Sequence, residues 1–101
     1  MATSADGAVA AQRWRVAGRG IHSRHWGNEV VVYHEATAST HLLDAGCGEV
    51  LLTLQRADRE LDAMQLWRDI FSGEPSPQER LDLIDSLASL VQVGLVVSIK
   101  S

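Results

Sequence analysis

The hydrophobic pattern of this chain changes its period at Asp44. Before that residue, the segment Glu29–His34 is rich in β-branched and aromatic residues, as strands are. After it, apolar residues recur three or four positions apart, which is the spacing of helices. Because the strands precede the helices along the chain, the pattern predicts an α+β domain rather than a parallel sheet.

We expect the first part of the chain to form a three-stranded antiparallel meander. Its first strand covers Trp14–Val16, and a glycine-punctuated loop follows from Gly18 to Asn28. The second strand is Glu29–His34 and the third is Thr40–Leu43. Five residues separate these two strands, a common length for a hairpin loop, so they should pair antiparallel.

A first helix is expected from Ala45 to about Gln55, with Asp44 as its N-cap. Gly46 and Gly48 each weaken its first turn by about 1 kcal/mol relative to alanine. The residues expected on its core face are Val50, Leu51 and Leu54.

Two further helices have clear start signals. Asp62 and Gln65 can form a capping box for the second helix, and Gly73 is its expected C′ residue. Its expected core face comprises Met64, Trp67, Ile70 and Phe71. The third helix starts at Ser76-Pro77-Gln78-Glu79, which combines a capping box with proline at N1, and Gly94 stops it. Its apolar positions are Leu83, Ile84, Leu87, Leu90 and Val91, and a short strand or extended tail follows.

Length and composition predict one small cytoplasmic domain. The chain has 101 residues, of which 46% are hydrophobic, and a formal net charge of −4. This charge argues against a general polyanion binder. A single cysteine excludes an internal disulfide and suits a reducing compartment, and no apolar run reaches the ~20 residues of a membrane span. We expect a flexible tail over residues 1–12 and a folded domain over residues 13–101.

Four histidines and one cysteine raise the question of a metal site. His22 and His25 are close in sequence, and His34, His41 and Cys47 could lie near one another. However, no pair has the spacing of a closed zinc site, and histidines that flank a hairpin loop can simply face water. We therefore expect no metal and no other cofactor.

The sequence does not favour an enzyme. Cys47 falls in the first turn of an expected helix, where the helix dipole can lower a thiol pKa, but no histidine–acid pair is evident beside it. Asp82 and Asp85 are three positions apart on a helix, as on many solvated helix faces. The segment Gly18–Gly20 is too short for a phosphate-binding loop. We expect no catalytic residue.

The third helix could also be the recognition helix of a winged-helix DNA-binding regulator. From Gln78 to Leu90, however, three acidic residues outnumber the single Arg80, giving a net charge of −2. A helix that enters the major groove needs basic or amide side chains. DNA binding is therefore a minor alternative.

Recognition of a peptide agrees better with these features. A three-stranded meander leaves at least one edge with unpaired N–H and C=O groups. If Thr40–Leu43 forms that edge beside the third helix, an extended peptide can add as a further strand. Proline at His41 or Leu43 would then remove a donor that the peptide needs. Such an edge also permits a homodimer. Apolar pockets for the peptide would come from Leu83, Leu87 and Leu90, although some of these leucines should also fill the core.

Several segments resemble one known family. Trp26–His34 reads WGNEVVVYH, Thr40–Asp44 reads THLLD, and Glu49–Leu51 reads EVL. The chain leaves its last helix through Gly94-Leu95. Over about residues 14–97 these features resemble the PqqD-like proteins, in particular the branch called the HPr-rel-A system PqqD family peptide chaperone.

The resemblance implies a RiPP recognition element with a winged-helix-like fold of three strands and three helices. Such a domain binds a precursor (leader) peptide by strand addition and presents it to a modifying enzyme, which in the named branch resembles HPr kinase. An adaptor of the same fold that docks an enzyme without a precursor peptide is the alternative. Carried onto this chain, the resemblance places the peptide against Thr40, His41, Leu42, Leu43, Asp82, Leu83, Ser86, Leu87 and Leu90.

Two positions depart from the family pattern. The hairpin loop usually has glycine where this chain has Ala38, so either a positive-φ turn is strained by about 1 kcal/mol or the turn has changed type. The first turn after Asp44 contains Gly46, Cys47 and Gly48 where the family prefers alanine and leucine. This second departure weakens the start of the helix.

Overall fold

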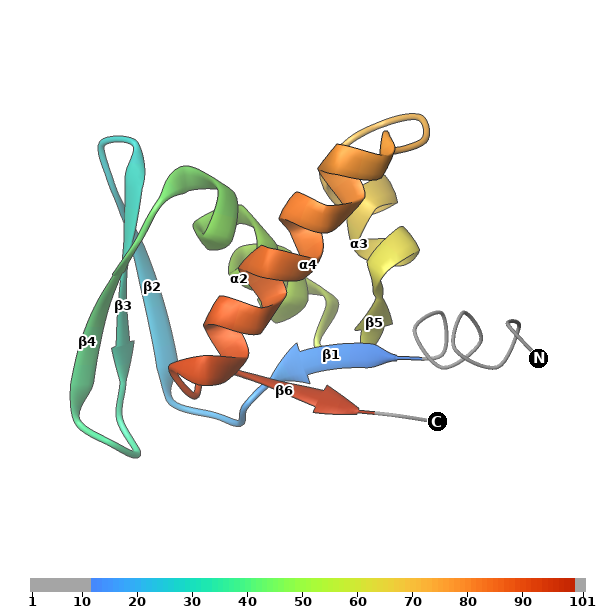
Figure 1. The fold of residues 1–101 in the computed structure, drawn as a ribbon. Coiled ribbons are helices and arrows are strands. Elements are labelled where there is room, and N and C mark those ends of the chain that lie inside the picture. The colour runs from blue at the N-terminus through green and yellow to red at the C-terminus, as the bar shows by residue number, and fades with distance from the viewer. Residues whose placement is uncertain (1–11, 100–101) are drawn as a thin grey trace.

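The computed structural model describes residues 12–99, and the expected flexible tail lies almost wholly outside that part of the chain. The described residues form two three-stranded antiparallel sheets and three helices (Figure 1). This α+β, winged-helix-like arrangement confirms the predicted fold class. In chain order the elements are β1 (Arg13–Val16), β2 (Ile21–Trp26), β3 (Glu29–His34), β4 (Ser39–Leu43), α2 (Ala45–Ala57), β5 (Leu61–Asp62), α3 (Ala63–Ile70), α4 (Pro77–Gln92) and β6 (Val96–Ile99).

The first sheet has the order β2-β3-β4, and its second hairpin is the predicted one. His34 pairs with Ser39 and Val30 pairs with Leu43, so β3 and β4 are antiparallel as expected. The meander's first strand, however, is β2 and not the segment Trp14–Val16. The prediction of a loop from Gly18 to Asn28 was therefore wrong over most of its length.

Polar side chains on the inner face of β2 explain this error. Ser23 donates a hydrogen bond to Gln55 Oε1 of α2 (2.8 Å), and Gln55 Nε2 donates to the carbonyl of Ile21 (2.9 Å). On this strand, hydrogen bonds take the place of apolar contacts with the core. The alternation of apolar residues by which a strand is recognised in a sequence is therefore missing. Gly27 has a φ of +64° and opens a tight two-residue turn between β2 and β3, as glycine does at the first position of a type II′ turn.

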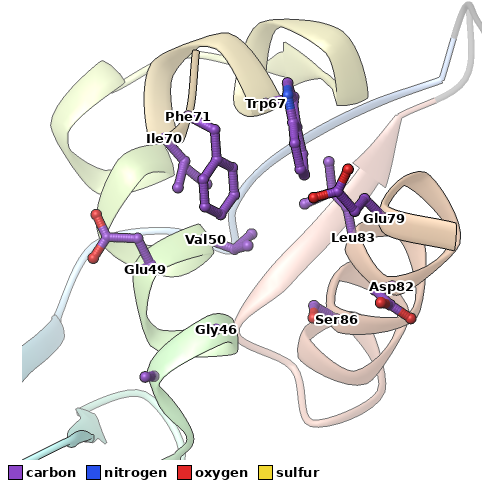
Figure 2. Close-up of a pocket in the computed structure, with 11 residues that line it drawn as sticks. Gly46, Glu49, Val50, Trp67, Ile70, Phe71, Glu79, Asp82, Leu83 and Ser86 are labelled. Carbon is purple, nitrogen blue, oxygen red and sulfur yellow. The ribbon is translucent and has the colours of Figure 1, made fainter. Parts of the chain in front are cut away.

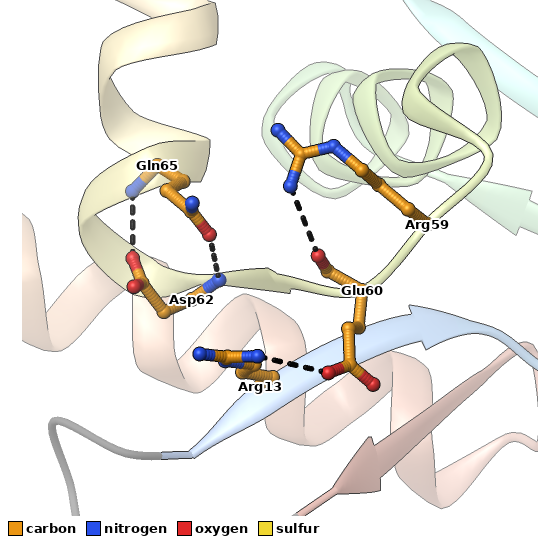
Figure 3. A network of polar contacts seen from close by, with 5 residues as sticks. All are labelled: Arg13, Arg59, Glu60, Asp62 and Gln65. Atoms are coloured by element: carbon orange, nitrogen blue, oxygen red, sulfur yellow. Dashed lines mark hydrogen bonds and ion pairs between the residues drawn. The ribbon is translucent and has the colours of Figure 1, made fainter.

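The second sheet, of order β5-β1-β6, joins segments from the two ends of the described chain. Arg13 pairs with Ile99 and Val16 pairs with Val96, so the expected C-terminal strand forms and pairs with β1. Trp14 points from β1 into the core and is 3% exposed. Glu60, next to β5, forms an ion pair with Arg13 (3.0 Å; Figure 3).

Helix α2 is the central helix and packs against the first sheet at a glycine. Asp44 caps it, accepting a hydrogen bond from the Cys47 N–H (2.8 Å), and the predicted core face is buried. At Gly48 the helix approaches β3 so closely that a Cβ would lie 2.4 Å from Val30 Cγ2. The glycine that weakens the helix in isolation is therefore required where the helix meets the sheet.

The predicted capping boxes of α3 and α4 both form. In α3, Asp62 accepts from the Gln65 N–H and the Gln65 side chain accepts from the Asp62 N–H, at 2.8 and 2.9 Å (Figure 3). In α4, Ser76 and Glu79 are paired in the same way. The predicted core face of α3 is corrected, because Leu66 and Trp67 are its buried residues, whereas Phe71 follows the helix as its C-cap and is 52% exposed.

Alanine at the two glycines of α2 should have opposite effects on stability. Gly48→Ala should lower the free energy of unfolding by about 1–3 kcal/mol, because the added methyl overlaps Val30. Gly46→Ala should raise it by up to about 1 kcal/mol, since a Cβ there meets only Asp44 Oδ1 at 3.5 Å and alanine favours the helix. Denaturant unfolding followed by tryptophan fluorescence measures both, and equal stability of the two variants would contradict this packing.

The sequence allowed two alternatives for the turn between β3 and β4, a strained positive-φ turn or a turn of another type. The structure shows the strained turn. Ala38 has a φ of +54°, in the left-handed region, and its N–H donates to the Glu35 carbonyl (3.2 Å). Ala38→Gly should therefore raise the free energy of unfolding by about 0.5–1 kcal/mol. Ala36→Gly, in the same turn but at negative φ, is the control and should lower it. A lower thermal midpoint for the Ala38 variant would refute the strain.

Candidate functional site

Strand β4 presents a free edge. Within the described residues it pairs only with β3, at the outer side of the first sheet (Figure 1). The C-terminal strand β6, which could have covered this edge, pairs instead with β1 in the second sheet. A backbone ladder on β4 is therefore available to another extended chain.

The register shows which β4 groups face outward. The Glu35 N–H donates to the Gly20 carbonyl (2.9 Å), so odd-numbered residues of β3 direct their backbone groups toward β2. The even-numbered residues of β3 then face β4, where they meet Ser39, His41 and Leu43. Thr40 and Leu42 consequently direct their N–H and C=O groups to the free edge. Proline at His41 or Leu43 would thus break the hairpin rather than the outer edge, which corrects the expected effect of those substitutions.

Beyond the end of β4 lies a pocket of about 590 Å³ between the three helices (Figure 2). Leu43 is the last residue of β4, Asp44 caps α2, and Ala45 is the first pocket residue. The edge strand therefore leads directly to the pocket. Its lining comprises Ala45, Gly46, Glu49 and Val50 from α2, Trp67, Ile70 and Phe71 from the α3 region, and Glu79, Asp82, Leu83 and Ser86 from α4.

The pocket has apolar walls built around two aromatic rings. Trp67 and Phe71 are one helical turn apart, with their centroids at 4.4 Å and their planes tilted by 35°. Figure 2 shows the two rings next to each other above Val50, with the indole nitrogen at the end of the ring that is farther from Val50. That nitrogen is buried and has no hydrogen-bond partner among the described residues. The indole thus presents carbon atoms to the pocket.

Three carboxylates surround this apolar surface. Glu49 forms an ion pair with Arg56 along α2 (3.5 Å). Glu79 accepts a hydrogen bond from the Ser76 N–H, and Asp82 accepts one from the Gln78 side chain (3.0 Å). Within residues 12–99, neither Glu79 nor Asp82 has an ion-pair partner, and no arginine lines the pocket. The α4 side of the pocket is therefore negatively charged.

The structure brings together part of the predicted site. Asp82, Leu83 and Ser86 line the pocket, and Thr40–Leu43 supply the adjacent edge. Leu87 and Leu90 lie elsewhere. They are 0% and 1% exposed and belong to the core, because they lie on the face of α4 that packs against α2. Their side chains are therefore not accessible to a peptide at the surface.

Sequence reasoning missed the α2 and α3 walls of the pocket. Trp67, Ile70 and Phe71 had the spacing of a core face, and only the short length of α3 leaves the last of them exposed. Nothing in the sequence indicated that Gly46 and Glu49 line a pocket, since the pocket depends on how three helices meet. The exposed aromatic residue at a helix end is the feature that could have indicated the pocket.

Cys47 and the histidines make separate local contacts. Burial raises the pKa of the Cys47 thiol above its ordinary value of 9.0, the opposite of activation, although a hydrogen bond with Ser86 acts in the other direction. His34 is 7% exposed rather than turned toward water as expected, and His41 is half-buried and contacts Ser39 (3.0 Å). Among residues 12–99, no three His, Cys, Asp or Glu side chains are grouped as metal ligands.

Comparison with known proteins gives one informative similarity. The fold resembles a solved structure described as TbiB1 in complex with the TbiA(beta) leader peptide, with a TM-score of 0.61 and 25% sequence identity. The similarity covers 81% of this chain and 93% of that one. No family model matches the sequence, and no curated protein does.

No helix in the described part of the chain combines the length and apolar character of a membrane span.

The raised pKa of Cys47 should be visible in its reactivity. With a disulfide reagent such as DTNB, the rate should increase with pH to a midpoint above 9.0, because only the thiolate reacts. Ser86→Ala should move the midpoint further up, since that hydrogen bond favours the thiolate. The midpoint, unlike the rate, does not depend on access to the sulfur, and a value below 9.0 would contradict the effect of burial.

Proposed function

We propose that this protein is a non-catalytic peptide chaperone that binds a precursor (leader) peptide and presents it to a modifying enzyme. The peptide adds as a strand to β4, and its continuation enters the pocket between the helices. The observation that carries this proposal is the free edge of β4 leading directly to an apolar pocket. Main-chain hydrogen bonds on such an edge give affinity, while pockets beside it give specificity.

The similarity to TbiB1 in complex with a leader peptide supports this proposal, as does the resemblance to the PqqD-like proteins. The same resemblance implies a modifying enzyme that resembles HPr kinase. This partner, the homodimer and the cytoplasmic location all stay predictions. The acidic character of α4 argues against the DNA-binding alternative, because Glu79 and Asp82 would face the phosphates.

The outward-facing N–H of Leu42 provides the test of strand addition. Leu42→Pro should weaken peptide binding about tenfold or more, because the donor is lost and the pyrrolidine ring obstructs the edge. The substitution should leave the protein folded, since Leu42 is 61% exposed and its N–H is not bonded to β3. The probe is the tightest-binding peptide from a phage-displayed random library, measured by fluorescence anisotropy.

Leu42→Ala is the matched control, because it removes the same side chain and keeps the N–H. Circular dichroism verifies that both variants are folded. If a folded Leu42→Pro protein binds the peptide as the wild type does, strand addition is wrong. If the library yields no binding peptide at all, the adaptor that docks an enzyme without a precursor peptide becomes the better interpretation.

A further inference from the structure

We infer that the pocket between α2, α3 and α4 selects peptides in which a large apolar residue is adjacent to a lysine or arginine. This inference rests on the proposed function and specifies the chemistry of the peptide. It follows from three properties of the described residues: the pocket lining begins at Ala45, two residues after the end of β4, the walls of the pocket are apolar, and the carboxylates of α4 that line it form no ion pair.

The position of the pocket just after β4 determines where the selected residues lie in the peptide. A strand added to β4 runs past Leu43 and then past the start of α2, where Ala45 and Gly46 line the pocket. An extended chain advances about 3.3 Å per residue, so two or three residues beyond the last ladder position reach the pocket. The peptide therefore needs a strand-forming segment with its anchor a short distance away along the chain.

The walls determine the anchor. Val50, Leu83 and the tilted pair of Trp67 and Phe71 present carbon atoms to the pocket, and Phe71 is 52% exposed. A Leu, Met, Phe or Trp side chain placed there removes apolar surface from water on both partners. The volume of about 590 Å³ is ample for one such side chain together with the aliphatic stem of a neighbouring residue.

The rim determines the charge. Glu79 and Asp82 lie one turn apart on α4, and neither forms an ion pair within residues 12–99. Arg80, the basic residue between them, is directed to Met64 Sδ of α3 (3.9 Å) rather than to either carboxylate. A cation that extends from the peptide along this rim meets two unneutralised carboxylates, whereas an acidic peptide residue would be repelled.

Selection from a phage-displayed random peptide library tests this inference. The wild type should enrich peptides with an apolar residue next to lysine or arginine. The double variant Glu79→Gln/Asp82→Asn should enrich the same strand-forming and apolar features without the basic residue. Glutamine preserves the α4 capping box, and asparagine can still accept from Gln78, so the fold is retained. Asp85→Asn is the matched control for Asp82→Asn alone, because each removes one carboxylate from α4 and Asp85 is outside the pocket lining.

Affinity measurements give the second readout. For a selected synthetic peptide, the double variant should weaken binding about three- to tenfold, and replacing the peptide's lysine or arginine by glutamine should give a similar loss. Combining the two changes should add little, because they remove the same interaction. Phe71→Ala should weaken binding of both the basic and the neutral peptide.

The outcomes separate this inference from the proposed function. Enriched peptides that bind through Leu42 but show no excess of basic residues, or an unchanged affinity of the double variant, would overturn the inference alone. Equal losses of affinity from Asp85→Asn and Asp82→Asn would also overturn it, since the effect would then be general electrostatics. A library without any enriched peptide would overturn the proposed function and this inference together.

Discussion

The close approach of α2 to β3 determines the arrangement of the whole domain. It is possible because residue 48 has no side chain to separate the helix from Val30. Helix α2 contacts β1, β3, β4, α3 and α4, so its position sets the spacing between the first sheet and the other helices. Because β4 runs into α2 through the single residue Asp44, the same contact fixes the strand edge relative to the pocket.

Local signals in the sequence predicted the elements that depend on local interactions. The capping boxes at Asp62 and Ser76 form as expected, because each needs only residues within one turn. The β3–β4 hairpin was also predictable from its β-branched residues and loop length. Strand β2 could not be predicted from its own residues. Its inward-facing Ser23 forms a hydrogen bond with Gln55, which is far away in the sequence. The pairing of β1 with β6 likewise depends on contacts between the two ends of the chain.

The β4 edge of the candidate site could be predicted from the sequence, because it depends on a single strand. The pocket could not, because it forms where three helices meet. The edge role of Thr40–Leu43 follows from strand order, and the structure agrees that β4 is an edge. On α4, helical spacing alone could not separate Leu83, which lines the pocket, from Leu87, which fills the core. Trp67 and Phe71 had the pattern of core residues, and only the end of α3 at Ile70 places the second ring at the surface.

The pairing of β1 with β6 has a consequence for how this domain can be connected to other proteins. Arg13 and Ile99 are opposite each other in the second sheet, at the side of the molecule away from β4 (Figure 1). Polypeptide entering at one strand and leaving at the other therefore passes through neighbouring points. A domain with this geometry can be joined to other polypeptide at either end, or at both, without obstructing the free edge of β4.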